Sequence, residues 1–158
     1  MDDAVRRNIL EVITAGHDLT LATLREDGWP QATTVSYASD GMAILFGCDG
    51  QSQKARNLGR DDRVSLTINL PYGAWNEIRG LSIGGRARRL TDPADLARAG
   101  EAFMKKFAPE IAQYLNAANV EMAMFEVVPT VVSVLDYRQG FGHTELVTAA
   151  QLAEPAAA

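Results

Sequence analysis

A short polar stretch, residues 48–58, carries side chains that could hold one phosphate group. It follows a strand-like run, and Gly50 can turn the chain before a short helix begins. Helical spacing places Lys54 and Leu58 on one face, so the leucine can anchor the turn while the ammonium lies at the helix start. Free backbone N–H groups there, the Ser52 hydroxyl and the lysine charge together suit a phosphate. An ordinary solvated loop and helix would show the same local pattern.

Composition limits the classes of function. A chain of 158 residues, 47% of them hydrophobic, is long enough for one globular domain with a proper core. Its net charge of −5 argues against a nucleic-acid partner, because phosphate-backbone binding needs a surplus of Lys and Arg. One cysteine and two histidines exclude an internal disulfide and support no metal site. We expect a cytoplasmic protein with no membrane partner, because no signal-peptide core or spanning stretch is present.

Hydrophobic periodicity predicts the elements that must position this stretch. Residues 5–13 have helical spacing, and Gly16 is a natural stop for that helix. Three strand-like runs follow without intervening helices, at residues 19–24, 31–37 and 42–46. Successive strands of this kind predict an antiparallel meander and argue against a doubly wound nucleotide-binding sheet.

Two further strands are expected after the short helix. Residues 64–68 alternate with a period of two, and residues 78–90 form a long strand-like run. We interpret Gly84–Gly85 within that run as a bulge or a point of close backbone approach. The loop between the two strands carries Tyr72 and Trp75, which either edge a pocket or plug the end of a barrel.

A capped helix and the last strands complete the domain. Asp92 and Pro93 start the helix, and its apolar stripe is interpreted as core with no chemical role. The stripe consists of Leu96, Ala99, Phe103 and Phe107. A further short helix is expected at residues 110–115, then strand material at 125–128 and 131–135, interrupted by Pro129. We therefore expect one domain over residues 1–148 and a loosely ordered tail over 149–158.

The order and spacing of these pieces resemble the FMN-binding split-barrel family, whose best-known member is pyridoxamine 5'-phosphate oxidase. The matching pieces are residues 30–35, 42–47, 52–54, 62–66 and 78–87. The resemblance implies a mainly β fold with flanking helices, built on a six-stranded antiparallel split β-barrel. It also implies an oxidoreductase that moves hydride or electrons between a small reductant and a small-molecule acceptor.

The resemblance also suggests cofactor-binding positions. In the family the flavin ring lies along the strand that matches Thr33–Ser36, although β-propensity alone would explain the threonines. The family has Arg and Lys after the serine; here Gln53 takes the Arg position and Lys54 is kept, which leaves a phosphate less well neutralised. Arg79 could contact phosphate or ring, or lie on the surface. The implied set is Thr33, Thr34, Val35, Ser36, Cys48, Ser52, Gln53, Lys54, Arg79, Phe141 and His143.

The last two residues of that set follow from the family's assembly. Its members are homodimers with two flavins between the subunits, so residues 137–144 become candidates for the second subunit's contribution. Phe141 and His143 offer stacking and proton donation, while neighbouring glycines let the backbone approach a ligand. A glycine-rich turn before a final strand explains the same residues. The chain lacks the glutamine and the basic C-terminal motif of true pyridoxamine 5'-phosphate oxidases, which counts against pyridoxine phosphate as substrate.

No nucleophile-base pattern is present, so the cofactor would carry any chemistry. Two alternatives to an FMN oxidoreductase stay open. The related scaffold also takes a deazaflavin, which would make the protein a deazaflavin-dependent reductase. From a different class, the chain could be a non-catalytic binding module for flavin or haem, with His143 as the natural haem ligand.

Overall fold

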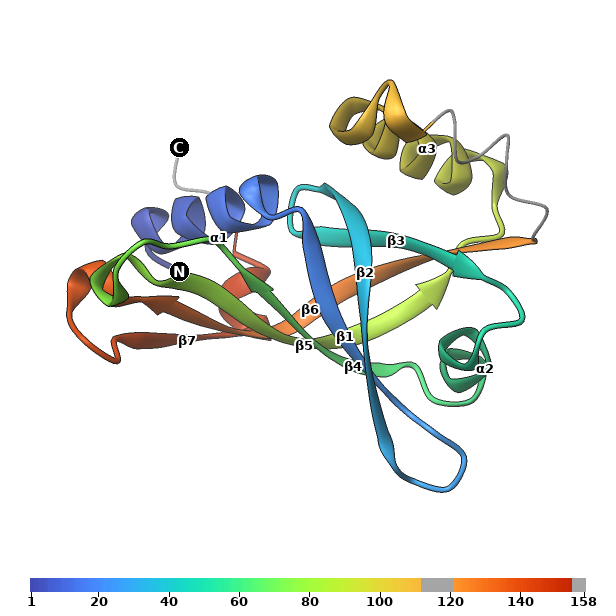
Figure 1. Ribbon diagram of the computed structural model, residues 1–158, viewed down its shortest axis with the longest axis horizontal. Coiled ribbons are helices and arrows are strands. Elements are labelled where there is room, and N and C mark those ends of the chain that lie inside the picture. The colour runs from blue at the N-terminus through green and yellow to red at the C-terminus, as the bar shows by residue number, and fades with distance from the viewer. Residues whose placement is uncertain (112–120, 155–158) are drawn as a thin grey trace.

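The computed structural model describes residues 1–111 and 121–154, and its centre is a closed antiparallel barrel (Figure 1). The strand order β3-β2-β1-β4-β5-β6, with β3 also pairing with β6, closes six strands into this barrel. The strands are β1 (Asp18–Leu24), β2 (Pro30–Asp40), β3 (Ala43–Asp49), β4 (Arg63–Asn69), β5 (Arg79–Arg89) and β6 (Met122–Asp136). The fold class predicted from the sequence is confirmed.

The predicted bulge lies where β5 meets β6. The register between the two strands shifts between Gly84 and Gly85, and Pro129 pairs opposite Gly85. A Cβ on Gly85 would come within 2.7 Å of the Val128 carbonyl oxygen, so only glycine fits this close approach. Proline has no N–H for the sheet ladder and is tolerated at such an irregularity. β6 therefore continues through Pro129 as one strand, where the sequence suggested an interruption.

A seventh strand lies outside the closed barrel. β7 (Thr144–Thr148) pairs with residues 131–135 of β6, whereas the first part of β6 pairs with β3. The helix α5 (Ala149–Leu152) follows, so the first residues of the expected loose tail are helical. Residues 155–158, and most of the helix predicted at 110–115, lie outside the described residues.

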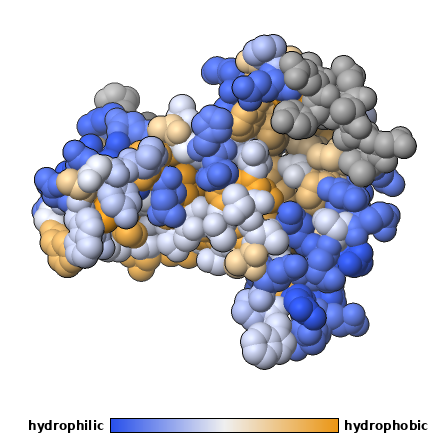
Figure 2. Space-filling view, viewed as in Figure 1, coloured by the Kyte–Doolittle hydropathy of each residue, from blue (hydrophilic) through white to orange (hydrophobic). Residues whose placement is uncertain are grey.

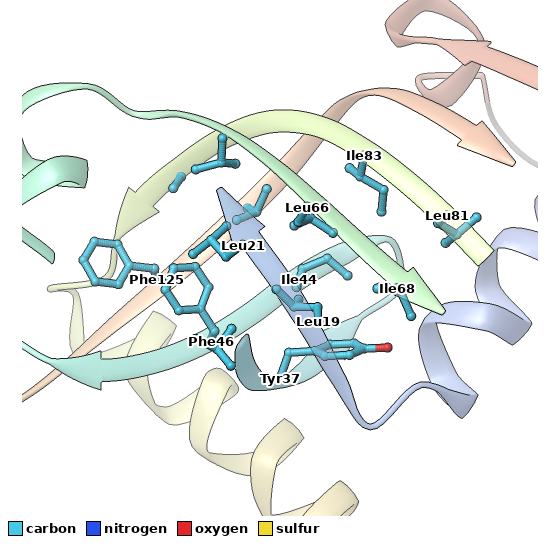
Figure 3. Packing of buried hydrophobic residues seen from close by; sticks show 14 of the residues in the cluster. Leu19, Leu21, Tyr37, Ile44, Phe46, Leu66, Ile68, Leu81, Ile83 and Phe125 are labelled. Atoms are coloured by element: carbon cyan, nitrogen blue, oxygen red, sulfur yellow. The ribbon is translucent and has the colours of Figure 1, made fainter. Parts of the chain in front are cut away.

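Alternating side chains fill the barrel interior (Figure 3). The residues labelled there are Leu19, Leu21, Tyr37, Ile44, Phe46, Leu66, Ile68, Leu81, Ile83 and Phe125, each at most 2% exposed. The helix α1 (Asp3–Ala15) adds Ile9, Val12 and Ile13 to the same cluster. The Tyr37 hydroxyl donates a 2.6 Å hydrogen bond to the Ile13 carbonyl oxygen, which ties that helix to the barrel.

Two more helices lie outside the barrel (Figure 1). α2 (Gln53–Arg60) connects β3 to β4, and α3 (Pro93–Phe107) packs on the outer face of β2 and β3 through a small core of its own. The buried members of this second core are Ala38, Leu45, Leu90, Ala99 and Phe103. None of the described helices is long and apolar enough to span a membrane.

Candidate functional site

A cleft of about 640 Å³ lies between α3 and the strands β2, β3 and β6, with the first turn of α2 at one end. Its described lining residues are Thr34, Val35, Ser36, Gly47, Cys48, Asp49, Ser52, Lys54, Leu96, Gly100, Phe103, Met104, Ile111, Met122 and Met124. Six of these are predicted cofactor-binding residues: Thr34, Val35, Ser36, Cys48, Ser52 and Lys54. The structure therefore brings residues from two strands and a helix start into one cavity.

The first turn of α2 offers several donors to this cavity. Ser52 is the N-cap, and its hydroxyl oxygen accepts a 3.3 Å hydrogen bond from the Ala55 amide. The amides of Gln53 and Lys54 have no hydrogen-bond partner among the described residues. No described carboxylate forms an ion pair with Lys54, although Asp49 lines the same cleft. This end of the cavity therefore combines a positive helix terminus with a free ammonium.

A buried asparagine holds α2 in this position. Asn57 is fully buried, and its Nδ2 donates to Thr23 Oγ1 at 2.9 Å and to Gln31 Oε1 at 3.2 Å. Gln53 completes the set by donating its Nε2 to Asn57 Oδ1 at 2.8 Å. Because these bonds reach β1 and β2, they fix the helix start against the strands that line the cleft. The Gln53 side chain takes part in this network, which gives a structural reason for a glutamine at the position where the split-barrel family has arginine.

One edge of β2 is open beside the same helix start. Residues 30–36 pair with β1 on one side, whereas pairing with β3 begins only at Tyr37. No described strand pairs with the other edge of residues 30–36, so alternate backbone N–H and C=O groups there are free to meet a ligand. Thr34 and Ser36 point to the outer face of the barrel and line the cleft, while Thr33 alternates to the opposite side.

The apolar stripe of α3 lines the cleft as well as packing the core, which corrects the sequence-based interpretation. Ala99 and Phe103 are buried, but Leu96 remains 40% exposed and faces the cavity. Apolar residues on the barrel-facing side of α3 are visible in Figure 2. Helical spacing shows which face of α3 is apolar and gives no sign of the strands it covers.

The lining residues that sequence reasoning missed come from α3, β3, β6 and the segment that follows α3. They are Gly47, Asp49, Leu96, Gly100, Phe103, Met104, Ile111, Met122 and Met124. Gly100, in the middle of a predicted helix, is the one weak sequence signal among them.

A network of charges anchors the start of α3 to the barrel. Glu126 of β6 is 8% exposed and accepts hydrogen bonds from Arg88 at 2.6 Å and from Arg98 at 2.7 Å. Arg98 also reaches Asp40 of β2 at 3.0 Å, and Arg88 reaches Asp95 of α3. Burial raises the pKa of Glu126, but the two guanidinium groups together hold it below its ordinary value. The charged form of Glu126 therefore stabilises the position of α3 over the cleft.

The remaining predicted residues lie away from the chain's own cleft. Arg79 donates to Asn8 and, at 2.8 Å, to Glu11 of α1, and it does not line the cavity. His143 lines a separate cavity of about 740 Å³ between α1 and the β6–β7 end, where Arg7 and Asp136 also lie. Within one chain, neither residue lines the cleft.

Phe141 belongs to an exposed aromatic group together with Trp75 and Tyr137. It is 79% exposed, its ring stacks on Trp75 at a centroid distance of 6.0 Å, and Tyr137 lies at 5.4 Å. Trp75 is itself 69% exposed, so it neither plugs the barrel nor lines the described cavities. The barrel-plug role suggested for Trp75 from the sequence is therefore wrong, and within one chain Trp75 edges neither of these two cavities.

These features define a split-barrel protein with an outer cleft that ends at a helix N-terminus. Residues 5–136 match the sequence profile of the pyridoxamine 5'-phosphate oxidase family, and the chain belongs to that family. No curated protein matches the chain.

Solved structures with the same fold include three bacterial proteins. A haem-binding protein from Mycobacterium smegmatis is 24% identical with a TM-score of 0.74, covering 91% of this chain and 59% of its own. A conserved hypothetical protein from Mycobacterium tuberculosis is 26% identical with a TM-score of 0.73, covering 95% and 94%. HutZ, a haem storage protein from Vibrio cholerae, is 18% identical with a TM-score of 0.65, covering 78% and 88%. This chain spans about three fifths of the M. smegmatis protein.

Proposed function

We propose that the protein binds FMN in the cleft and acts as an oxidoreductase on a small molecule. The observation that carries this proposal is the open edge of β2 beside the N-terminus of α2 in one cavity. A flavin mononucleotide has a hydrogen-bonding ring and a single phosphate. The unpaired backbone groups of residues 30–36 suit the ring, and the helix start with Lys54 suits the phosphate.

The residues present fit this ligand. The free amides of Gln53 and Lys54, the Ser52 hydroxyl and the Lys54 ammonium would hold the phosphate. A cavity of about 640 Å³ lies within the usual range for sites of molecules this size. When bound, FMN supplies hydride or electron transfer. The backbone groups of residues 30–36 would then orient the ring along β2, and α3, which covers the cleft, would exclude water from the ring.

A second copy of the chain would complete the site. Phe141 and Trp75 expose large aromatic surfaces that a monomer leaves in water. Contact between these rings and the cleft of a partner would cover both surfaces in a symmetric homodimer. This arrangement explains why Phe141 lies outside the cleft of its own chain.

Two other cofactors compete with FMN. A deazaflavin would use the same β2 edge and helix start. Haem is supported by the shared fold of the M. smegmatis haem-binding protein and the V. cholerae haem storage protein. Among the described lining residues no histidine is present, and His143 lies in the other cavity, so Cys48 and the methionines would be the available haem ligands.

The proposal is tested by titrating apo-protein with FMN and with riboflavin. Lys54→Ala should weaken FMN binding by about ten- to a hundredfold, because a charge-assisted hydrogen bond contributes about 1.5–3 kcal/mol. Riboflavin lacks the phosphate and should bind both proteins equally. Lys105→Ala removes an exposed lysine that does not line the cleft and serves as the control. Equal FMN affinities for wild type and Lys54→Ala would exclude the phosphate role.

A further inference from the structure

Gly100 lies in the middle of α3 and lines the cleft. A glycine inside a helix destabilises it relative to alanine, so its presence there calls for a reason. The described packing gives none: Gly100 is exposed at the cleft, and a Cβ built on it would have no described atom within 4 Å. Among the described residues, the missing side chain leaves room at the cleft that a ligand could use.

The room lies in an apolar half of the cleft. Leu96 and Met104 are four residues before and after Gly100, so they share its helix face. Met122 and Met124 lie across from them on β6, on one face of that strand. No charged side chain is found among the described residues of this half, whereas Asp49, Ser52 and Lys54 belong to the other end.

We infer that the apolar half beneath Gly100 receives an uncharged aromatic molecule beside the cofactor, and that Gly100 determines its size. This inference rests on the proposed function, which places the cofactor along β2 and the α2 start. An uncharged ligand follows from the lack of charged groups there, because the apolar side chains offer a charged group no partner. An aromatic ligand follows from the methionines, whose flexible thioethers make favourable contacts with aromatic rings.

The test uses N-phenyl-1-naphthylamine, an uncharged aromatic probe whose fluorescence rises in apolar surroundings. We expect it to bind wild-type protein both with and without FMN. Gly100→Leu should fill the apolar half and weaken probe binding by about tenfold or more. Gly59→Leu is the matched control, because Gly59 lies in α2 outside the cleft and a Cβ there also meets no described atom within 4 Å.

A second variant keeps the test independent of the glycine. Met104 is 46% exposed, so Met104→Glu introduces a charge at the cleft without disturbing the core, and it should also weaken probe binding by about tenfold. Unchanged probe binding in both variants would overturn the inference. Displacement of the probe by FMN would also overturn it, because the flavin itself would then fill the apolar half. If FMN fails to bind while the probe responds to both variants, the proposed function fails and the apolar site stands.

Discussion

At the scale of single residues, Lys106 at the end of α3 carries a charge that is partly removed from water. Its Nζ lies 3.7 Å from the centroid of the buried Tyr37 ring and has no hydrogen-bond partner among the described residues. A cation over an aromatic face is attracted to it, which offsets part of the loss of water. Burial nevertheless lowers the pKa of Lys106 to about 8.

This pKa has a consequence for stability. Between about pH 8 and an unfolded pKa of about 10.4, the folded protein binds fewer protons than the unfolded chain, so Lys106 makes stability rise with pH in that window. Lys106→Met should remove this rise while leaving the fold intact. Urea unfolding at pH 7.5, 9 and 10 would measure it, with the exposed Lys105→Met as control. Parallel pH profiles for wild type and Lys106→Met would contradict the prediction.

Asn57 shows what a single side chain contributes to the site beyond its own position. Its partners Thr23 and Gln31 precede it by 34 and 26 residues, so no local pattern announces the contact. Ser52, Gly50 and Lys54 could be picked out from the sequence because helix starts have local signatures. The hydrogen bonds of Asn57 that hold this helix start beside the cleft are tertiary contacts, and they could not be predicted from the sequence.

At the scale of elements, the placement of α3 depends on Glu126. Glu126→Ala leaves Arg88 and Arg98 without their shared carboxylate and should lower the free energy of unfolding by about 1–3 kcal/mol at pH 7. Because the folded pKa of Glu126 is depressed, its contribution is present above the unfolded pKa and is lost as pH falls through the folded value. The difference between wild type and variant should therefore shrink in acid.

A matched ion pair provides the control for Glu126. Asp62 and Arg86 are both well exposed, so Asp62→Ala should change the unfolding free energy by only about 0–1 kcal/mol. Chemical denaturation of the two variants at pH 7 and pH 4 measures the comparison. Equal losses for Glu126→Ala and Asp62→Ala would show that the network contributes no more than a surface pair.

The elements themselves were largely predictable, and their mutual contacts were not. Asp92 and Pro93 mark the start of α3, and paired glycines mark the bulge in β5, because caps and bulges need particular residue types. Pro129 led to a wrong prediction, an interrupted strand, because a proline usually breaks a strand unless the pairing there is irregular. That the irregularity lies opposite, at Gly85, follows only from the register of two strands distant in sequence.

At the scale of the whole molecule, the exposed aromatic group predicts assembly. We expect a homodimer with a mass of about twice 17.1 kDa, because Phe141 and Trp75 leave apolar surface for a partner to cover. Phe141→Ser should shift the protein toward the monomer, whereas Trp29→Ser, at an equally exposed turn residue, should not. Light scattering at several concentrations measures both. A wild-type protein that stays monomeric would remove the shared site.

The most direct measurement of the central claim is the absorption spectrum of the purified protein, followed by denaturation and identification of any released chromophore. We expect a yellow protein with a two-banded flavin spectrum that releases FMN, or a colourless apo-protein that acquires this spectrum when FMN is added. A Soret band, a released deazaflavin, or a colourless protein that fails to take up FMN would contradict the assignment of the cleft as an FMN site.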